Sequence, residues 1–323
     1  MQIDIIIPMY HSTKTIQQTL GSILMQTVIE DIQVTLVNDG DGQDYNSIIK
    51  PFTDLMHIQE LKMPRNQGPG AARQFGIDHT SASYIMFVDS DDTLNSPFAV
   101  ELLLRELEQN QDYVMCGGAF VEEHENLHFT HHINDITWIF RKIYRRAFLE
   151  KYQIRFTHTS ANEDTGFNSK IKLIATQEEQ ICFIQNIVYN WHATPNSITR
   201  KNDFEYTYNQ SFEGYVINII DTFHFVKKNR PYQISIDDWA IAGMANLYWY
   251  YYATLKFKPE FAEQNFKHCI KYYTQVYRHV ETKYPNEMYE DIFAKEAEVA
   301  GRTYRSVVPD KTIYQFINNL KTK

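Results

Sequence analysis

The acidic run Asp89-Ser90-Asp91-Asp92 directly follows the apolar residues 84–88. On an extended backbone Asp89 and Asp91 point to the same side, because side chains alternate along a strand. Two such carboxylates suit Mg²⁺ or Mn²⁺, which retain water and take further ligands from a diphosphate. The metal would neutralise the charge that develops on a departing phosphate. The alternative is an acidic turn in which Asp92 or Ser96 caps the next helix.

Four further polar residues are candidates for a binding or catalytic role: Asp39, Arg73, Asp164 and His192. Asp39 could accept a hydrogen bond from a base imide or a ribose hydroxyl, or form an ordinary turn before a glycine. Arg73 could pair with a phosphate, fix an aspartate or remain solvated. Asp164 could be a general base or a helix cap. His192 could bind a metal or a phosphate, although a lone histidine is more often structural.

The elements that must hold these residues alternate between strands and helices. Segments rich in apolar residues predict strands at 3–7, 33–38 and 84–88. A short strand is expected at 57–62, with helices between the strands. We expect Ser12 to cap the first helix. This alternation predicts an α/β fold with a doubly wound, mostly parallel, Rossmann-like sheet. Ligands bind at the carboxyl ends of strands in such sheets, and three polar clusters lie there: Pro8–His11, Asp39–Asp41 and Asp89–Asp92.

The character of the chain changes beyond residue 200. Residues 112–200 are mixed, with strands expected near 113–121 and 181–191. Helical periodicity then dominates, and 15 of the 22 tyrosines lie beyond residue 200. We expect one α/β domain at 1–204 and a helical C-terminal domain of four or five helices at 205–323. The tyrosines of that domain can simply form its core, or residues 249–252 could line an acceptor groove or a self-association face that makes a homo-oligomer.

Composition limits the kind of partner. The net charge of -9 argues against a nucleic-acid ligand. The three cysteines, Cys116, Cys182 and Cys269, are far apart and predict neither a disulfide framework nor a zinc site. The first residues predict a strand and no signal peptide, and no apolar run is long enough to span a membrane. We therefore expect a cytoplasmic protein, with peripheral contact to the inner face of a membrane still open.

Five ordered motifs within about residues 1–200 resemble the family 2 glycosyltransferases with a GT-A fold. Residues 5–11 are similar to the family's opening strand and P-x-Y-N motif, with His11 in place of the usual Asn. Residues 37–40 are similar to its V-D-D-G segment, with Asn38 for the first Asp. The other three are N-x-G-x-x-x-A-R over residues 66–73, the D-x-D-D segment at 89–92 and the E-D pair at 163–164.

The resemblance implies a concrete site. Pro8, Tyr10, Asp39, Arg73, Asp89 and Ser90 would surround the nucleotide. Asp89 and Asp91, with His192 as a further candidate, would bind Mn²⁺ or Mg²⁺. Asp164 would deprotonate the acceptor hydroxyl, and a single displacement would invert the anomeric configuration. The donor would be a nucleotide-sugar, with UDP as the family's usual carrier. The acceptor would be a glycan, lipid-linked or protein-linked, in synthesis of bacterial surface polysaccharide, teichoic acid or glycoprotein glycan.

Two other functions fit parts of the sequence. A nucleotidyltransferase could use a similar sheet, but that class favours a glycine-rich loop after the first strand, and residues 9–15 contain no glycine. A non-catalytic scaffold could combine a degenerate α/β domain with an aromatic helical binding module. The presence of Asp89, Asp91 and Asp164 argues against such degeneration.

Overall fold

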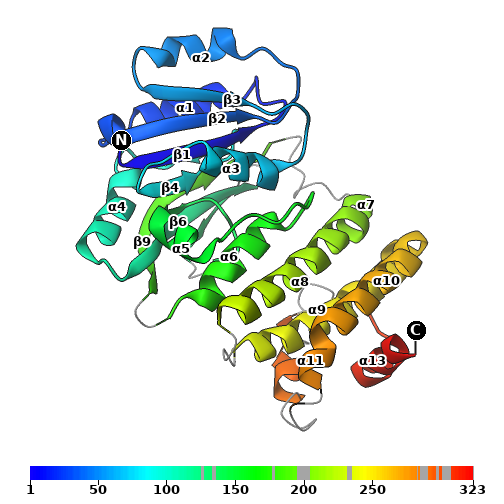
Figure 1. Ribbon diagram of the computed structural model, residues 1–323. Helices are drawn as coiled ribbons and strands as arrows, with labels where there is room; N and C mark the ends of the chain where they lie inside the picture. The colour runs from blue at the N-terminus through cyan, green and yellow to red at the C-terminus, as the bar shows by residue number, and fades with distance from the viewer. Residues whose placement is uncertain are drawn as a thin grey trace. The chain divides into compact units, whose positions relative to one another are not determined.

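The computed structural model divides into two compact units (Figure 1). It describes residues 1–124, 127–132, 136–176, 179–194, 204–230, 235–281, 283, 290–295, 298–299 and 307–322. Unit 1 consists of Met1–His158 and Glu163–Lys201, and unit 2 consists of Thr159–Asn162 and Asn202–Lys323. A four-residue piece of the first 200 residues thus belongs to the helical unit, which the sequence did not predict.

Four parallel strands form the first half of the sheet in unit 1. They are β1 (Ile3–Met9), β2 (Ile32–Asn38), β3 (His57–Lys62) and β4 (Tyr84–Phe87), in the spatial order β3-β2-β1-β4. All three pairings are parallel, as in a doubly wound sheet. Since parallel strands end at one edge, the residues that follow β1, β2 and β4 gather there. The predicted fold class is confirmed in this half.

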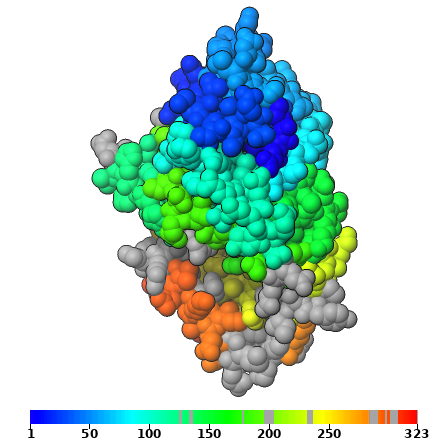
Figure 2. Space-filling model, turned by 90° about the vertical axis from the view of Figure 1, so that its left-hand side faces the viewer, coloured from blue at the N-terminus to red at the C-terminus, as the bar shows by residue number. Residues whose placement is uncertain are grey.

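Helices cover both faces of these strands. They are α1 (Ile16–Leu24), α2 (Asn46–Thr53), α3 (Pro69–Asp78) and α4 (Ala99–Gln109), with a short turn η1 (Ile29–Asp31). Ile5 and Ile7 of β1 share a buried core with α1 and α4, whereas Ile6 faces α3. A Cβ on Gly76 of α3 would lie 2.5 Å from Ile6, so only glycine permits this approach. Figure 2 shows the blue and teal segments that contain α1 and α4 side by side on one face.

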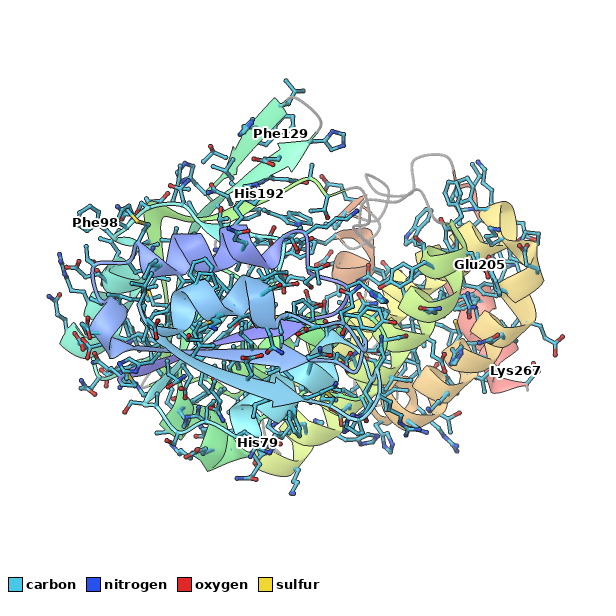
Figure 3. All side chains as sticks on the ribbon, turned by 90° about the horizontal axis from the view of Figure 1, so that it is seen from above. His79, Phe98, Phe129, His192, Glu205 and Lys267 are labelled. Atoms are coloured by element: carbon cyan, nitrogen blue, oxygen red, sulfur yellow. The ribbon has the colours of Figure 1, made fainter. Side chains whose placement is uncertain are left out.

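The second half of the sheet is mixed. It contains β5 (Thr93–Leu94), β6 (Tyr113–His124), β7 (Leu127–His131), β8 (Lys142–Arg145) and β9 (Gln180–Trp191), in the order β4-β8-β6-β9-β5 with β7 paired to β6. The strand β8 runs antiparallel to both β4 and β6, while β6 and β9 are parallel. The β6–β7 hairpin carries the exposed Phe129, which is the register partner of Glu122 (Figure 3). Neither β7 nor β8 was predicted.

Two helices complete unit 1, α5 (Arg146–Tyr152) and α6 (Glu163–Ile174). Phe167 of α6 is fully buried and stacks on Phe156 at 4.2 Å, with Phe87 of β4 edge-on to both. This aromatic cluster fixes α6 against the centre of the sheet, because buried rings dominate packing energetics. The first turn of α6 is the part that carries the predicted base.

Unit 2 is helical, as predicted. Its elements are α7 (Phe204–Tyr206), the π-helical turn η2 (Thr207–Ser211), α8 (Phe212–Asn229), α9 (Ser235–Phe257), η3 (Pro259–Phe261), α10 (Ala262–Tyr272), the π-helical turn η4 (Tyr273–Tyr277), α11 (Arg278–Glu281) and α13 (Ile313–Lys321). Many of its tyrosines lie in its own core. Tyr248 and Tyr252 pack against Phe316, and Tyr250 donates a hydrogen bond to the Thr207 carbonyl. Tyr250 and Tyr252 therefore pack within unit 2, whereas an acceptor groove or a self-association face at residues 249–252 stays a prediction.

The prediction that Ser12 caps α1 is wrong. Thr15 is the N-cap residue of that helix, and the Ser12 hydroxyl instead contacts Tyr10 and Ser90. Among the described residues the three cysteines are free, although Cys116 and Cys182 are register partners on β6 and β9. Within the described part of the chain, no helix combines the length and apolarity needed to cross a bilayer.

Candidate active site

The acidic run lies at the carboxyl end of β4. Asp89 is half-buried, and its Oδ1 accepts a hydrogen bond from Arg73 at 2.6 Å. Asp91 is also half-buried, and its Oδ2 accepts from the Thr194 hydroxyl at 2.9 Å. Burial and the neighbouring Asp89 charge raise the pKa of Asp91. A cation beside Asp89 and Asp91 would relieve the repulsion between their two carboxylates, so this position favours cation binding.

Asp92 is a structural member of the run. Its carboxylate is 1% exposed and accepts hydrogen bonds from the Tyr189 hydroxyl and the His192 amide, both at 2.9 Å. Burial, followed by the charges of Asp89 and Asp91, raises its pKa well above the ordinary value. Asp92 therefore ties β9 to the end of β4. It does not cap α4, which was the alternative reading of the run.

Arg73 connects the acidic run to the start of α6. The side chain is 5% exposed; Nη2 donates to Asp89 at 2.6 Å and Nη1 to Glu163 at 2.8 Å. Burial opposes its charge, but Asp89 and Glu163 more than offset that effect and raise the pKa of Arg73. The sequence left three roles open for Arg73: pairing with a phosphate, fixing an aspartate, or a solvated side chain. The observed geometry matches the second, with Asp89 as the aspartate.

Asp164 is the second residue of α6. Its Oδ1 accepts a hydrogen bond from the Thr165 amide at 2.7 Å. Burial and the adjacent Glu163 charge raise its pKa to about 7, against the opposing influence of Thr165, Arg73 and Lys142. A carboxylate with such a pKa can take a proton near neutral pH. Glu163, to which the sequence assigned no role, is the residue through which Arg73 reaches this helix.

Asp39 is held by the loop that opens α3. Its Oδ1 accepts from the Gln67 amide and its Oδ2 from the Gly68 amide, both at 2.8 Å. Gly40 approaches Arg65 so closely that a Cβ would lie 2.5 Å from the Arg65 carbonyl carbon. Each carboxylate oxygen has a second lone pair, so Asp39 can still accept from a ligand. The structure thus gives Asp39 a loop-fixing role. The residue is 3% exposed, and its contact with a nucleotide stays a prediction.

The residues at the end of β1 and just after it are partly accessible to solvent. Pro8 is half-buried, and the Tyr10 ring is 49% exposed and edge-on to His11 at 4.3 Å. His11 has a φ of 56°, a left-handed conformation that asparagine adopts more readily than most residues. The His11 amide donates to Asp41, whose carboxylate also accepts from Tyr45.

His192 lies near the base of the β6–β7 hairpin (Figure 3). Its Nδ1 is 3.0 Å from Glu123, and its Nε2 is 2.7 Å from the Thr93 hydroxyl. Both ring nitrogens therefore have partners, and metal binding through either would require a partner to be released. Its role as a third ligand stays a prediction.

A divalent metal fits the chemistry of Asp89 and Asp91. Oδ2 of Asp89 has no hydrogen-bond partner in the described part of the chain, and both side chains are partly accessible. Among the described residues, no group of three or more acidic, histidine or cysteine side chains is arranged to hold a metal. Mg²⁺ and Mn²⁺ fit such a site, since they keep several waters and bind through one or two carboxylates plus phosphates.

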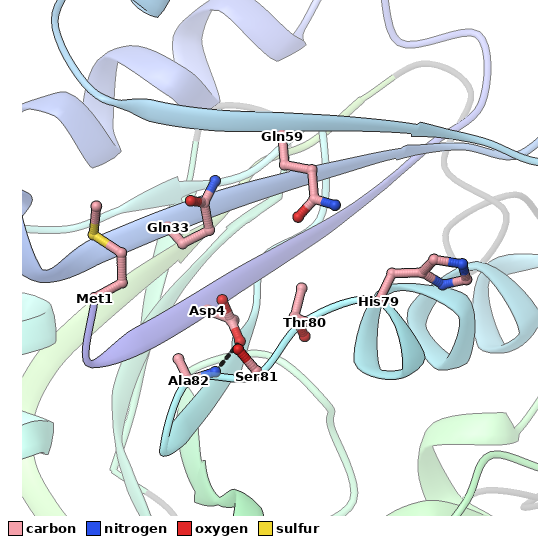
Figure 4. A pocket seen from close by; sticks show the side chains of 8 residues that line it. All are labelled: Met1, Asp4, Gln33, Gln59, His79, Thr80, Ser81 and Ala82. Atoms are coloured by element: carbon pink, nitrogen blue, oxygen red, sulfur yellow. Dashed lines mark hydrogen bonds between the residues drawn. The ribbon is translucent and has the colours of Figure 1, made fainter.

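A polar depression of about 350 Å³ lies at the opposite, amino-terminal edge of the sheet (Figure 4). Asp4, which lines it, accepts a hydrogen bond from the Ala82 amide and pairs with the buried Arg146 at 2.9 Å. These contacts hold β1 to the start of β4. They account for a buried aspartate without a ligand, so the acidic-run edge remains the candidate site.

The fold and this site define a GT-A type glycosyltransferase. Residues 4–163 match the family model "Glycosyl transferase family 2", and this chain belongs to that family. The matched segment begins in β1 and ends at Glu163, so it includes the acidic run and Arg73. Membership of the family supports sugar transfer as the enzyme class.

Relatives and solved structures agree with this assignment. EpsJ of Bacillus subtilis, an uncharacterized glycosyltransferase, is 30% identical over 61% of this chain and 62% of its own length. The poly(ribitol-phosphate) beta-N-acetylglucosaminyltransferase TarP of Staphylococcus aureus is 25% identical over 66% of this chain and 72% of its own. The chain spans less than two thirds of EpsJ and 32% of another curated relative, a glycosyltransferase of Streptococcus pneumoniae.

One solved structure shows the fold over almost the whole chain. The S. aureus TarS fragment 1–349 in complex with UDP-GlcNAc superposes with a TM-score of 0.71 at 16% identity, covering 94% of this chain and 92% of that one. At this identity the likeness concerns the fold alone. It extends beyond the family-matched residues into the helical part, for which the sequence suggested no relative.

Proposed function

We propose that this chain is an inverting glycosyltransferase that moves a sugar from a UDP-sugar to an acceptor hydroxyl. The observation that carries the proposal is the buried guanidinium of Arg73, which joins Asp89 to Glu163. One ionic network therefore connects a pair of carboxylates suited to a metal diphosphate with the residue next to Asp164.

Asp164 acts as the base in this proposal. Its carboxylate accepts the proton of the acceptor hydroxyl while that oxygen attacks the anomeric carbon. The bond from that carbon to the diphosphate breaks on the opposite face, and its electron pair leaves with the diphosphate. A single displacement of this kind inverts the anomeric configuration. The pKa of about 7 for Asp164 suits proton removal near neutral pH.

Asp89 and Asp91 would hold Mn²⁺ or Mg²⁺, which when bound supplies positive charge beside the departing diphosphate. Arg73 keeps Asp89 in place and the Thr194 hydroxyl keeps Asp91 in place. Tyr10, Ser90 and Pro8 are accessible enough to contact the nucleotide. Asp39 is only 3% exposed, and in this proposal it would accept from the nucleotide only after the loop at Gln67 and Gly68 gives way. Arg73 would act on the nucleotide through Asp89, because it is itself buried.

The names of similar proteins support a particular donor and acceptor class. TarP is named for transfer to poly(ribitol phosphate), and the TarS fragment was solved with UDP-GlcNAc. We assign this chain the same chemistry: a UDP-sugar donor and a hydroxyl of a bacterial surface glycopolymer as acceptor. Residues 1–204 would form the catalytic domain, and residues 205–323 a helical domain.

The test uses the full chain with Mn²⁺ and two donors, UDP-glucose and UDP-GlcNAc, with and without poly(ribitol phosphate). We expect acceptor-dependent release of UDP and a product with inverted anomeric configuration by NMR. Asp164→Asn should bind UDP but transfer no sugar. Full transfer by that variant, or a product of retained configuration, would refute the mechanism. Release of pyrophosphate from UTP would indicate a nucleotidyltransferase instead.

A further inference from the structure

The segment Thr159–Asn162 belongs to the helical unit, although the residues on both sides of it belong to unit 1. It ends at Asn162, which has a φ of 59°. Glu163 and the proposed base Asp164 follow directly in the chain. Asn162 is bonded directly to Glu163, so contacts that restrain Asn162 act on the residue that precedes the first turn of α6.

Helix α8 holds this segment through a buried asparagine. Asn218 is 1% exposed, and its Nδ2 donates to the Thr159 hydroxyl at 3.0 Å and to the Gly214 carbonyl at 2.8 Å. The Ala161 carbonyl lies 3.4 Å from the same nitrogen. One amide group thus links two residues of the segment to the helix backbone.

Two further contacts restrain the end of the segment. The Asn162 Nδ2 donates to the Ser211 carbonyl at 2.8 Å and to its hydroxyl at 3.0 Å. A Cβ on Gly214 would lie 2.4 Å from the Ala161 carbonyl oxygen, so α8 approaches the segment at a distance that only glycine allows. Ser211, Gly214 and Asn218 follow one another along η2 and α8, and all three contact the segment.

We propose that Asn162, Gly214 and Asn218 are positioning residues for catalysis, through which the helical unit fixes the chain that leads into Asp164. The inference rests on the proposed function, since it assigns these residues an effect on the proposed base. A base displaced by about 1 Å from its productive geometry can lose on the order of 10²-fold in rate. Loosening the segment should therefore reduce kcat and leave nucleotide binding unchanged.

A matched pair of glycine substitutions separates positioning from stability. Gly214→Ala places a Cβ 2.4 Å from the Ala161 carbonyl, and Gly243→Ala places one 2.4 Å from the Tyr272 hydroxyl within the same unit. Both substitutions crowd a helix of unit 2, but only the first presses on the segment. Unfolding midpoints, UDP affinity by calorimetry with Mn²⁺, and kcat and KM for the UDP-sugar are measured for both.

We expect Gly214→Ala to lower kcat at least tenfold with KM and UDP affinity within about twofold, while Gly243→Ala keeps the wild-type kcat at temperatures where it is folded. Asn162→Gly retains the left-handed backbone and removes both side-chain hydrogen bonds, and should lower kcat in the same selective way. If Gly214→Ala and Asn162→Gly both have the same kcat as Gly243→Ala while Asp164→Asn is inactive, the positioning role is refuted and the proposed function stands. If Asp164→Asn is active, the proposed base itself is wrong.

Discussion

Arg73 and Glu163 are 90 positions apart in the sequence, and their side chains meet at 2.8 Å in a buried ion pair. Arg73 also pairs with Asp89, which follows the carboxyl end of β4. One guanidinium group therefore connects this end of β4 to the beginning of α6. A Cβ on Gly70 would lie 2.8 Å from Glu163, which shows how tightly α3 and α6 are packed at this point.

Arg73→Ala should be strongly destabilising, because it leaves the 7%-exposed Glu163 without its cation. Loss of one partner of a buried pair typically costs about 3–5 kcal/mol. Urea unfolding at neutral pH measures the change. Arg105→Ala, which breaks an exposed pair with Glu101, is the matched control and should change stability little. Equal effects of the two substitutions would contradict a structural role for the Arg73 pair.

The transfer rate should rise with pH through about 7, because Asp164 must be ionised to accept a proton and its pKa is about 7. The Glu163 charge contributes to that raised pKa, so Glu163→Gln should move the acidic limb of the kcat profile to lower pH. Rates measured between pH 5 and pH 9 test this. A limb that stays in place or moves upward would show that another group controls the profile.

Asp164→Asn should stabilise the protein at alkaline pH. The folded-state pKa of Asp164 lies above its unfolded value, so its contribution to stability is present below about pH 4 and is lost as the pH rises through about 7. Asparagine carries no charge and avoids that loss. The difference in urea midpoint between the variant and the wild type should therefore be larger at pH 8 than at pH 4.5, and the reverse order would argue against a raised pKa.

Asp91→Asn should remove the Mn²⁺ dependence of nucleotide binding, because it replaces one of the two carboxylates assigned to the metal. Calorimetry with UDP, with and without Mn²⁺, measures this effect. Asp112→Asn removes the same charge from an exposed position away from the acidic run and should leave the Mn²⁺ effect intact. Wild-type Mn²⁺ dependence in Asp91→Asn would exclude Asp91 as a ligand.

Gly40→Ala and Gly42→Ala test the loop that holds Asp39. Both glycines have positive φ, 68° and 72°, so each substitution costs about 1–2 kcal/mol of backbone strain. Only at Gly40 would the new Cβ also collide with the Arg65 backbone, at 2.5 Å; at Gly42 nothing lies within 4 Å. We expect the Gly40 variant to lose more stability by thermal unfolding and to bind UDP more weakly. Similar losses in the two variants would mean that strain alone matters.

Much of the parallel half of the sheet could be predicted from the sequence. The buried strands β1, β2 and β4 are rich in apolar residues, and such segments are typical of strands covered on both faces. The strands β7 and β8 could not be predicted in this way. The residues of β7 are mostly exposed, and those of β8 include a buried Lys142, so neither shows the usual apolar pattern.

The positions of several candidate site residues could be predicted from the sequence, whereas most of the contacts between them could not, and their functional roles stay predictions. The positions of Asp39, Asp89 and Asp91 follow from strand ends, which is a local property. The pairing of Arg73 with Glu163, and of Asp91 with Thr194, depends on side chains brought together by the whole fold. The Ser12 prediction failed for a related reason: its hydroxyl is engaged by Ser90, 78 positions away, instead of by its own helix.

The segment Thr159–Asn162 makes the chain pass between the two units three times instead of once. A protein whose units join at a single point can exchange one of them in a single recombination event. In this protein, a replacement helical unit would also have to pack against residues 159–162, which lie between the two sequence segments of unit 1. The two parts are therefore expected to be inherited together, and residues 159–162 should change in step with Ser211, Gly214 and Asn218.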